Sequence, residues 1–269
     1  MMRRFFLALA LIGLSCLPAG AAITVTPKIF EATTTDGTSF VSVATWSVTT
    51  NALGICFAGT IDATTPGTLT LTQTGQTWDA VDATNAHELF DTIGTPLARF
   101  QAFRTLGAGA AAATVSLIVT GGTGNHTGFV LLCSEFAGQD TSGSNGSGAI
   151  IQSKDGSVDN TVDPTVTFDS GRTANSAVIF ASMSVGDACT TWAGEGGYTL
   201  GNATETNFAS PTVESLYEYV VGGSDTSPSF DQTGACTAPE IGSIAIEIKE
   251  AAAGGAQAPG SFGSLGVGR

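Results

Sequence analysis

Basic residues are scarce in this chain. Its 269 residues include 9 Lys and Arg against 23 Asp and Glu, which gives a formal net charge of −14. A surface of that sign repels phosphate backbones and anionic headgroups, so we expect no nucleic-acid partner and no charge-driven binding to membranes. The acidity instead suits an exported protein that like charges keep in solution.

Histidine is also scarce, and this limits the catalytic chemistry that the sequence supports. The 2 histidines, His87 and His126, lie in polar segments and are expected in exposed loops. Neither belongs to a Gly-x-Ser-x-Gly or His-Glu-x-x-His motif, and the chain has no Walker-type phosphate loop. We therefore assign no catalytic residue, and an enzyme is not the favoured interpretation.

The chain has no apolar run long enough to span a bilayer as a helix. Residues 5–17 come nearest; they follow a basic start at residues 1–4 and precede a small-x-small pattern at residues 19–21, which a signal peptidase cuts. We predict that residues 1–21 are a signal peptide and that the mature chain is secreted, to the extracellular space or the periplasm. Residues 3–7 also resemble the twin-arginine motif, so the general secretory and twin-arginine routes both stay open.

Four cysteines remain after this cleavage, and an even number in an exported chain suggests two disulfides. Cys189 and Cys236 lie in loop-like segments, whereas Cys56 and Cys133 lie in apolar, strand-like runs. We expect the pairs Cys189–Cys236 and Cys56–Cys133, with two buried free thiols as the alternative for the second pair. A zinc site is not indicated, because the chain lacks a close Cys-x-x-Cys pair.

The apolar residues recur with the two-residue period of half-buried β-strands. Residues 68–72 alternate Thr and Leu, and residues 41–44, 166–168 and 244–248 behave alike. Residues 129–132 and 177–180 are continuous apolar runs, which fit strands buried on both faces. Because Gly, Asn, Asp and Pro separate these segments, the sequence predicts an all-β fold of antiparallel strands.

The two halves of the chain share an order of features. Residues 50–58 resemble residues 174–182, and each segment is followed by a loop with a Trp, an aromatic strand, a Gly break and an apolar closing strand. We predict a jelly-roll-like antiparallel β-sandwich over residues 22–250, built from related halves at about 38–138 and 164–250. Two small domains are the alternative. Residues 251–269 are rich in Gly and Ala and are expected to form a disordered tail.

Three short motifs carry a resemblance to known proteins. The first is an Asn followed by apolar residues at the start of predicted strands. The second is Glu135-Phe136-Ala137-Gly138-Gln139-Asp140, at the end of a predicted strand, and the third is Ile246-Glu247-Ile248-Lys249-Glu250-Ala251, at the end of the closing strand. In these the chain resembles uncharacterised exported bacterial and phage-associated β-sandwich proteins, over most of residues 41–251. The resemblance implies a jelly-roll-like fold and no established chemistry.

Aromatic residues beside glycine-rich turns are the candidate ligand-binding residues. Trp78, Trp192 and Tyr198 could lie at an edge of the sandwich and stack on sugar rings. The alternative is that they pack in the core beneath a loop.

Acidic residues suggest two further sites. Asp155, Asp159 and Asp163 fall in a segment expected to be a loop, where carboxylates could bind Ca²⁺, although the spacing is not that of an EF-hand. The alternative is a solvated acidic loop. Glu135 and Glu218 are the best carboxylates for hydrolysis of a glycosidic bond, with solvent-facing strand residues as their alternative.

Three classes of function follow from these patterns. The first is an exported, non-catalytic β-sandwich that binds a carbohydrate or another surface ligand. The second is a structural or assembly subunit of a cell surface, filament or virion, with self-assembly through strand edges. The third is a glycan-active hydrolase or lyase. Size-exclusion chromatography separates the first two, because concentration-dependent large species favour assembly.

Overall fold

The computed structural model describes residues 22–62, 66–84, 86–90, 97–122, 126–159, 163–185, 192–201, 206–209, 212–232 and 240–252. Within these ranges the strands pair in antiparallel fashion, and one short 3₁₀ turn, η1 (Ser147–Ala149), interrupts them. The predicted all-β fold is confirmed. The predicted signal peptide, Cys189, Cys236 and nearly all of the predicted tail lie outside the described residues.

The first half forms two packed sheets. Its strands are β1 (Thr24–Thr33), β2 (Ser39–Trp46), β3 (Leu53–Asp62), β4 (Thr68–Gln73), β5 (Asp79–Ala80), β6 (His87–Phe90), β7 (Leu97–Leu106), β8 (Ala113–Thr120) and β9 (Phe129–Ala137). One sheet has the order β1-β9-β3-β7, with β5 and β6 both pairing with β7, and the other has the order β2-β8-β4. Strands β1 to β4 alternate between the sheets, and β7, β8 and β9 alternate again, which is a jelly-roll arrangement.

The second half repeats this arrangement. Its strands are β10 (Ile150–Asp159), β11 (Ala177–Val185), β12 (Trp192–Gly194), β13 (Thr199–Leu200), β14 (Thr206–Ala209), β15 (Thr212–Val221), β16 (Phe230–Gln232) and β17 (Glu240–Ile248). The order β10-β17-β11-β15, with β13 and β14 on β15, matches the first sheet strand for strand. The small sheet β12-β16 corresponds to β4-β8, and residues 164–168 hydrogen-bond to residues 226–230 in the place of β2. The fold is therefore all-β, with two related halves that each have the strand order of a jelly-roll sandwich.

The halves also repeat a turn. Asn51 precedes β3 with a φ of 62°, and Asn175 precedes β11 with a φ of 65°. Asparagine tolerates this left-handed conformation better than most residues. The residue after each Asn binds a glycine beyond the neighbouring strand: the Gly107 N–H donates to Ala52 O, and the Gly222 N–H donates to Ser176 O. Both turns therefore close by the same backbone contact.

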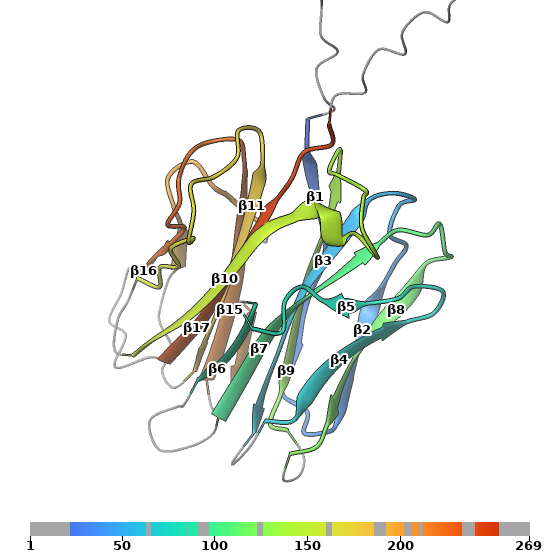
Figure 1. Cartoon of the computed structure of the whole chain (residues 1–269). Helices are drawn as coiled ribbons and strands as arrows, with labels where there is room; N and C mark the ends of the chain where they lie inside the picture. Colours follow the sequence, from blue (N-terminus) through green and yellow to red (C-terminus); the bar gives the residue numbers. More distant parts are fainter. Residues whose placement is uncertain are drawn as a thin grey trace, which may run out of the picture.

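The layers can be followed in Figure 1, where the sheet β1-β9-β3-β7 lies between the sheet of the second half and the sheet β2-β8-β4. Side chains of β3 alternate between its two neighbours, with Leu53, Ile55 and Phe57 facing the second half. They pack with Ile179 and Ile246, so the largest core cluster is shared by both halves. All ten residues of β3 are buried, as its apolar run requires, and the burial extends to the polar Thr60 and Asp62 at its end.

The segment between the halves, residues 138–149, is bonded to the residues that directly follow β17. The Lys249 Nζ lies 2.7 Å from the Asp140 Oδ2, and the Ala251 N–H donates to Gly138 O. The Asn145 side chain donates to Thr77 O and accepts the N–H of Leu106 at 2.9 Å. The segment is thus bonded both to the first half and to the last strand.

Candidate functional site

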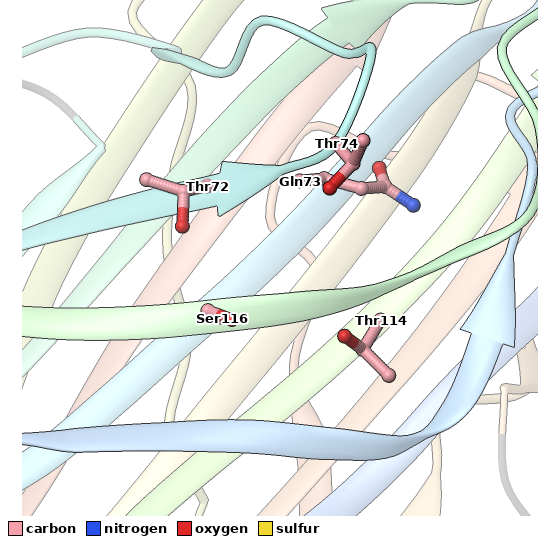
Figure 2. Close-up of a pocket in the computed structure, with 5 residues that line it drawn as sticks. All are labelled: Thr72, Gln73, Thr74, Thr114 and Ser116. Atoms are coloured by element: carbon pink, nitrogen blue, oxygen red, sulfur yellow. The ribbon is translucent and has the colours of Figure 1, made fainter.

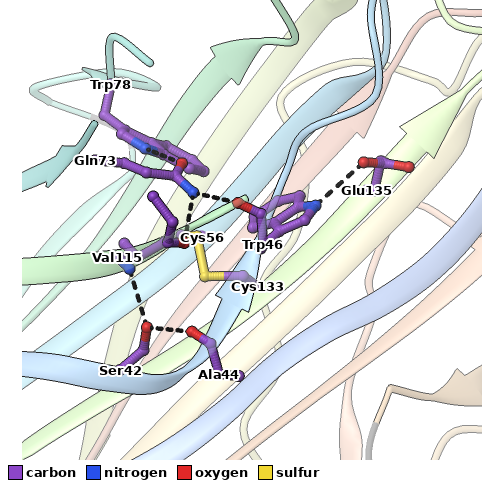
Figure 3. The surroundings of a disulfide bond; sticks show 10 residues. Ser42, Ala44, Trp46, Cys56, Gln73, Trp78, Val115, Cys133 and Glu135 are labelled. Carbon is purple, nitrogen blue, oxygen red and sulfur yellow. Dashed lines mark hydrogen bonds between the residues drawn. A yellow bond between two sulfur atoms is a disulfide. The ribbon is translucent and has the colours of Figure 1, made fainter. Parts of the chain in front are cut away.

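The predicted disulfide Cys56–Cys133 is present. The two cysteines are direct neighbours across β3 and β9, in the core between the middle sheet and β2-β8-β4. Trp46 and Trp78 pack over the bond (Figure 3), with their ring centroids 5.8 Å apart. A disulfide buried among apolar side chains is a structural bond rather than a reactive site.

The second half has no cysteine at the matching positions. Phe180 of β11 lies opposite Ala245 of β17, where Cys56 lies opposite Cys133 in the first half. The Phe180 ring stacks on Phe230, with centroids 4.8 Å apart. The two halves therefore fill equivalent core positions by different means, one covalent and one aromatic.

Trp78 and Tyr198, the two candidate aromatic residues whose side chains the structure describes, do not form an exposed platform. Trp78 is only 9% exposed, packs on Trp46 and donates its indole N–H to the Gln73 Oε1. This corrects the expectation of an edge-exposed ring, because a ring beside a turn can also fold inward over a core. Trp192 lies in β12, and its side chain is outside the described part of the structure.

Tyr198 is half-buried against the core of the second half. Its hydroxyl donates to the Asp225 Oδ2 at 2.8 Å. Burial and the neighbouring Asp225 raise the pKa of Tyr198 above its ordinary value. The hydroxyl is therefore engaged within the fold, and Trp78 and Tyr198 belong to the cores of different halves.

Glu135 was a candidate acid for glycosidic cleavage and proves to be a structural acceptor. Its carboxylate accepts the Thr49 N–H at 2.9 Å, the Thr49 hydroxyl and the indole N–H of Trp46, and Lys28 lies 3.5 Å away. Burial raises the pKa of Glu135, but these hydrogen bonds and the Lys28 charge outweigh it and hold the pKa below its ordinary value. Glu135 thus joins the loop before β3 to β9.

The second half repeats this contact with Glu247, which the sequence alone did not single out. Its fully buried carboxylate accepts the Thr173 N–H at 2.7 Å and the Gln152 side-chain amide at 2.6 Å. Glu218 is also fully buried and accepts the N–H of Glu195. The solvent-facing alternative is therefore wrong for Glu135 and Glu218 alike.

The candidate calcium residues do not share one loop. Asp155 and Asp159 belong to β10, an edge strand, and Asp163 follows it. The loop expectation is thus corrected: a Gly- and Asp-rich segment can still pair when a neighbouring strand offers its edge. Among the described residues, no three His, Cys, Asp or Glu side chains come close enough to hold a metal ion.

His126 is fully buried, which corrects its expected position in an exposed loop. Its backbone pairs with Gly37, its ring tilts against Phe129, and its Nδ1 lies 3.6 Å from the Asp62 Oδ2. Burial lowers the pKa of His126, and the attraction of Asp62 offsets this only in part. The imidazole is therefore neutral in the folded protein at neutral pH.

We expect the stability of the protein to fall as the pH drops below about 6.5, the ordinary pKa of histidine. The unfolded chain then binds a proton that the folded chain binds less readily, so protonation favours unfolding. The stability of the variant His126→Gln should therefore fall less than that of the wild type as the pH drops. Urea-unfolding midpoints of both proteins at pH 7.5 and 5.5 measure it; an equal decline in the two proteins contradicts the assignment.

The outward side of β2-β8-β4 is a surface of small hydroxyl and apolar side chains. We call it the hydroxyl face. Its residues are Thr68, Thr70 and Thr72 of β4, Thr114, Ser116, Ile118 and Thr120 of β8, and Ser39, Val41 and Thr45 of β2. None of these side chains carries a charge. In a protein with a formal net charge of −14, this makes the face chemically distinct.

Strand register brings these residues together. Thr72 of β4 lies opposite Ser116 of β8, which lies opposite Val41 of β2. The inward residues of the same strands, among them Leu69, Leu71 and Leu117, are buried over the middle sheet. A shallow hollow of about 300 Å³ opens on the face beside Gln73 (Figure 2), lined by Thr72, Gln73, Thr74, Thr114 and Ser116.

Comparisons with protein-family models, with curated proteins and with solved structures return no significant match. The described residues contain no helix that is long and apolar enough to cross a membrane.

Proposed function

We propose that this protein is an exported, non-catalytic binding protein whose hydroxyl face takes a neutral carbohydrate. The uncharged, hydroxyl-bearing surface around the hollow at Thr72 and Ser116 carries the proposal. Threonine and serine hydroxyls both donate and accept hydrogen bonds, as sugar hydroxyls do. The methyl groups of Thr and the side chain of Val41 supply apolar contact for sugar C–H groups.

The shape of the face favours an extended ligand over a small one. Sites for small molecules are concave and bury most of the ligand. The hollow here is shallow, and the strands that line it continue with uncharged side chains, from Thr68 of β4 to Thr45 of β2. A polysaccharide chain or particle can contact many such residues at once, and weak contacts then add up along its length.

Two observations favour export. The basic start and short apolar run of residues 1–21 are typical of a signal peptide. The Cys56–Cys133 disulfide is typical of oxidising compartments such as the periplasm or the cell exterior. A non-catalytic role accords with the engagement of Glu135 and Glu218 in internal hydrogen bonds.

Replacing Ser116 with Lys tests the proposal. Ser116 lies on the central strand of the face, so a lysine there adds a charge and a long side chain at the hollow. We expect the variant to lose at least tenfold in retention on the insoluble neutral polysaccharide that binds the wild type best, measured by depletion from solution over a panel of such polysaccharides.

Thr199→Lys is the matched control. Thr199 is an exposed threonine of β13, in the other half of the molecule, and its replacement adds the same charge. This variant should bind as the wild type does. Absence of wild-type binding to every polysaccharide, or equal loss in both variants, would refute the hydroxyl face as a carbohydrate site.

A further inference from the structure

Strand β4 has an edge that no other described strand covers. The sheet order β2-β8-β4 ends at β4, because β5 and β6 pair with β7 in the middle sheet. A jelly-roll sheet commonly continues with a fourth strand at this place. Among the residues that the structure describes, no strand therefore pairs with the backbone groups on this side of β4.

The backbone hydrogen bonds of β8, the neighbour of β4, show which backbone groups of β4 point to the open edge. The Val119 N–H donates to Thr38 O, and the Val115 N–H donates to the Ser42 Oγ. The backbone N–H and C=O groups of the odd-numbered residues of β8 thus point to β2, and those of the even-numbered residues point to β4. Thr70 lies opposite Ile118, so the Thr residues of β4 exchange backbone hydrogen bonds with β8. The backbone N–H and C=O groups of Leu69 and Leu71 therefore point away from β8, to the open edge.

Both ends of this open edge are closed by contacts within the chain. The Gly67 carbonyl accepts a hydrogen bond from the Arg99 guanidinium. The Gln73 carbonyl accepts the Gln76 N–H at 3.2 Å. Between these ends, in the described part of the chain, the N–H and C=O groups of Leu69 and Leu71 remain for a partner strand.

Three other long edge strands in the described part of the chain, β1, β2 and β10, carry features that oppose pairing. Strand β2 is irregular between Val41 and Thr45, and its Val43 and Ala44 N–H groups donate to the Glu31 carboxylate. The edge strands β1 and β10 each have a register shift and a lysine. Proteins use bulges and charges of this kind to prevent edge pairing. Strand β4, with the sequence TLTLTQ, has no bulge, proline or charge.

We propose that β4 pairs with β4 of a second copy of this chain, antiparallel and centred on Thr70. In this register Leu69 of each copy exchanges both backbone hydrogen bonds with Leu71 of the other, so every open group of these leucines is used. Thr70 then lies opposite Thr70 across the two-fold axis. Such a symmetric interface closes on itself and stops at the dimer.

The chemistry of the edge suits a second copy. Thr68 meets Thr72 on the outer side and leucine meets leucine on the inner side, so no like charges approach, even though each chain has a formal net charge of −14. The pairing joins two sheets into one continuous sheet and places the two hydroxyl faces side by side. It does not depend on the proposed function, because strand pairing needs no ligand.

A cysteine at the axis tests the register. In a pair of this kind the Thr70 Cα atoms lie about 4.5 Å apart, within the range of a disulfide. We expect Thr70→Cys to form a covalent dimer on mild oxidation, whereas Thr68→Cys alone should not, because position 68 faces position 72. A mixture of Thr68→Cys and Thr72→Cys should cross-link. Wild-type protein treated alike controls for the native cysteines.

Charge at the axis tests the interface itself. We expect Thr70→Lys and Thr70→Glu each to sediment as monomers, because like charges then meet across the axis, and an equimolar mixture to sediment as a heterodimer. Circular dichroism confirms that the variants are folded. A monomeric wild type at 100 μM, or no cross-linking of Thr70→Cys, overturns the proposal. Ser116→Lys should remain dimeric, so loss of ligand binding and loss of the dimer are separable.

Discussion

We expect the double variant Cys56→Ala/Cys133→Ala to be less stable than the wild type by about 4 kcal/mol in free energy of unfolding. The bond joins residues 77 positions apart, so removing it frees a long loop of the unfolded chain. Conformational entropy of that loop, rather than lost contacts, accounts for most of the expected change. Urea unfolding, followed by tryptophan fluorescence, measures it.

Reduction provides the control for this prediction. A reductant should lower the unfolding midpoint of the wild type by much more than that of the double variant, whose remaining cysteines lie elsewhere. Tryptophan fluorescence suits the measurement, because Trp46 and Trp78 pack over the bond. Equal midpoints for wild type and variant under oxidising conditions would show that the bond does not stabilise the fold.

We expect Glu247→Ala to destabilise the protein by about 3 kcal/mol. The substitution leaves the Thr173 N–H and the Gln152 amide without their acceptor, in a place where water has little access because Glu247 is fully buried. Glu247→Gln keeps one carbonyl acceptor for Thr173 and should lose less. Asp36→Ala, which removes a carboxylate from the exposed loop between β1 and β2, should leave the stability unchanged.

Chemical denaturation of these three variants under one set of conditions makes the comparison. If Glu247→Ala is no less stable than Asp36→Ala, the buried carboxylate does not hold the loop before β11. The same reasoning extends to Glu135, whose Thr49 contact is the counterpart in the first half.

The strands could be predicted because burial leaves a direct trace in local sequence. Thr68 to Thr72 alternate, and the structure places the leucines inside and the threonines outside. The continuous apolar runs became β9 and β11, in sheets covered on both faces. Strand β10 was missed as a full strand because edge strands need little apolar content, and its Gly and Asp residues resemble a loop.

The sites were harder to predict, because they depend on contacts between distant residues. Trp78 and His126 stand beside turn residues, and local sequence does not show whether such side chains fold inward or outward. The role of Glu135 depends on Thr49, which lies in the loop before β3. Only the pairing of β3 with β9 brings this loop near Glu135. The hydroxyl face likewise needs three strands aligned, and only the Thr residues of β4 reveal a part of it.

The contacts between residues 138–149 and the end of β17 bear on the origin of this architecture. The Lys249 N–H donates to Ala149 O, just before β10 begins, and the Ala251 N–H donates to Gly138 O. The second half thus starts and finishes at one point on the molecule, as modules that are inserted or copied within a gene commonly do. A second half attached at this point leaves the strand order of the first half unchanged, and each half has a core cluster of its own beside the shared one.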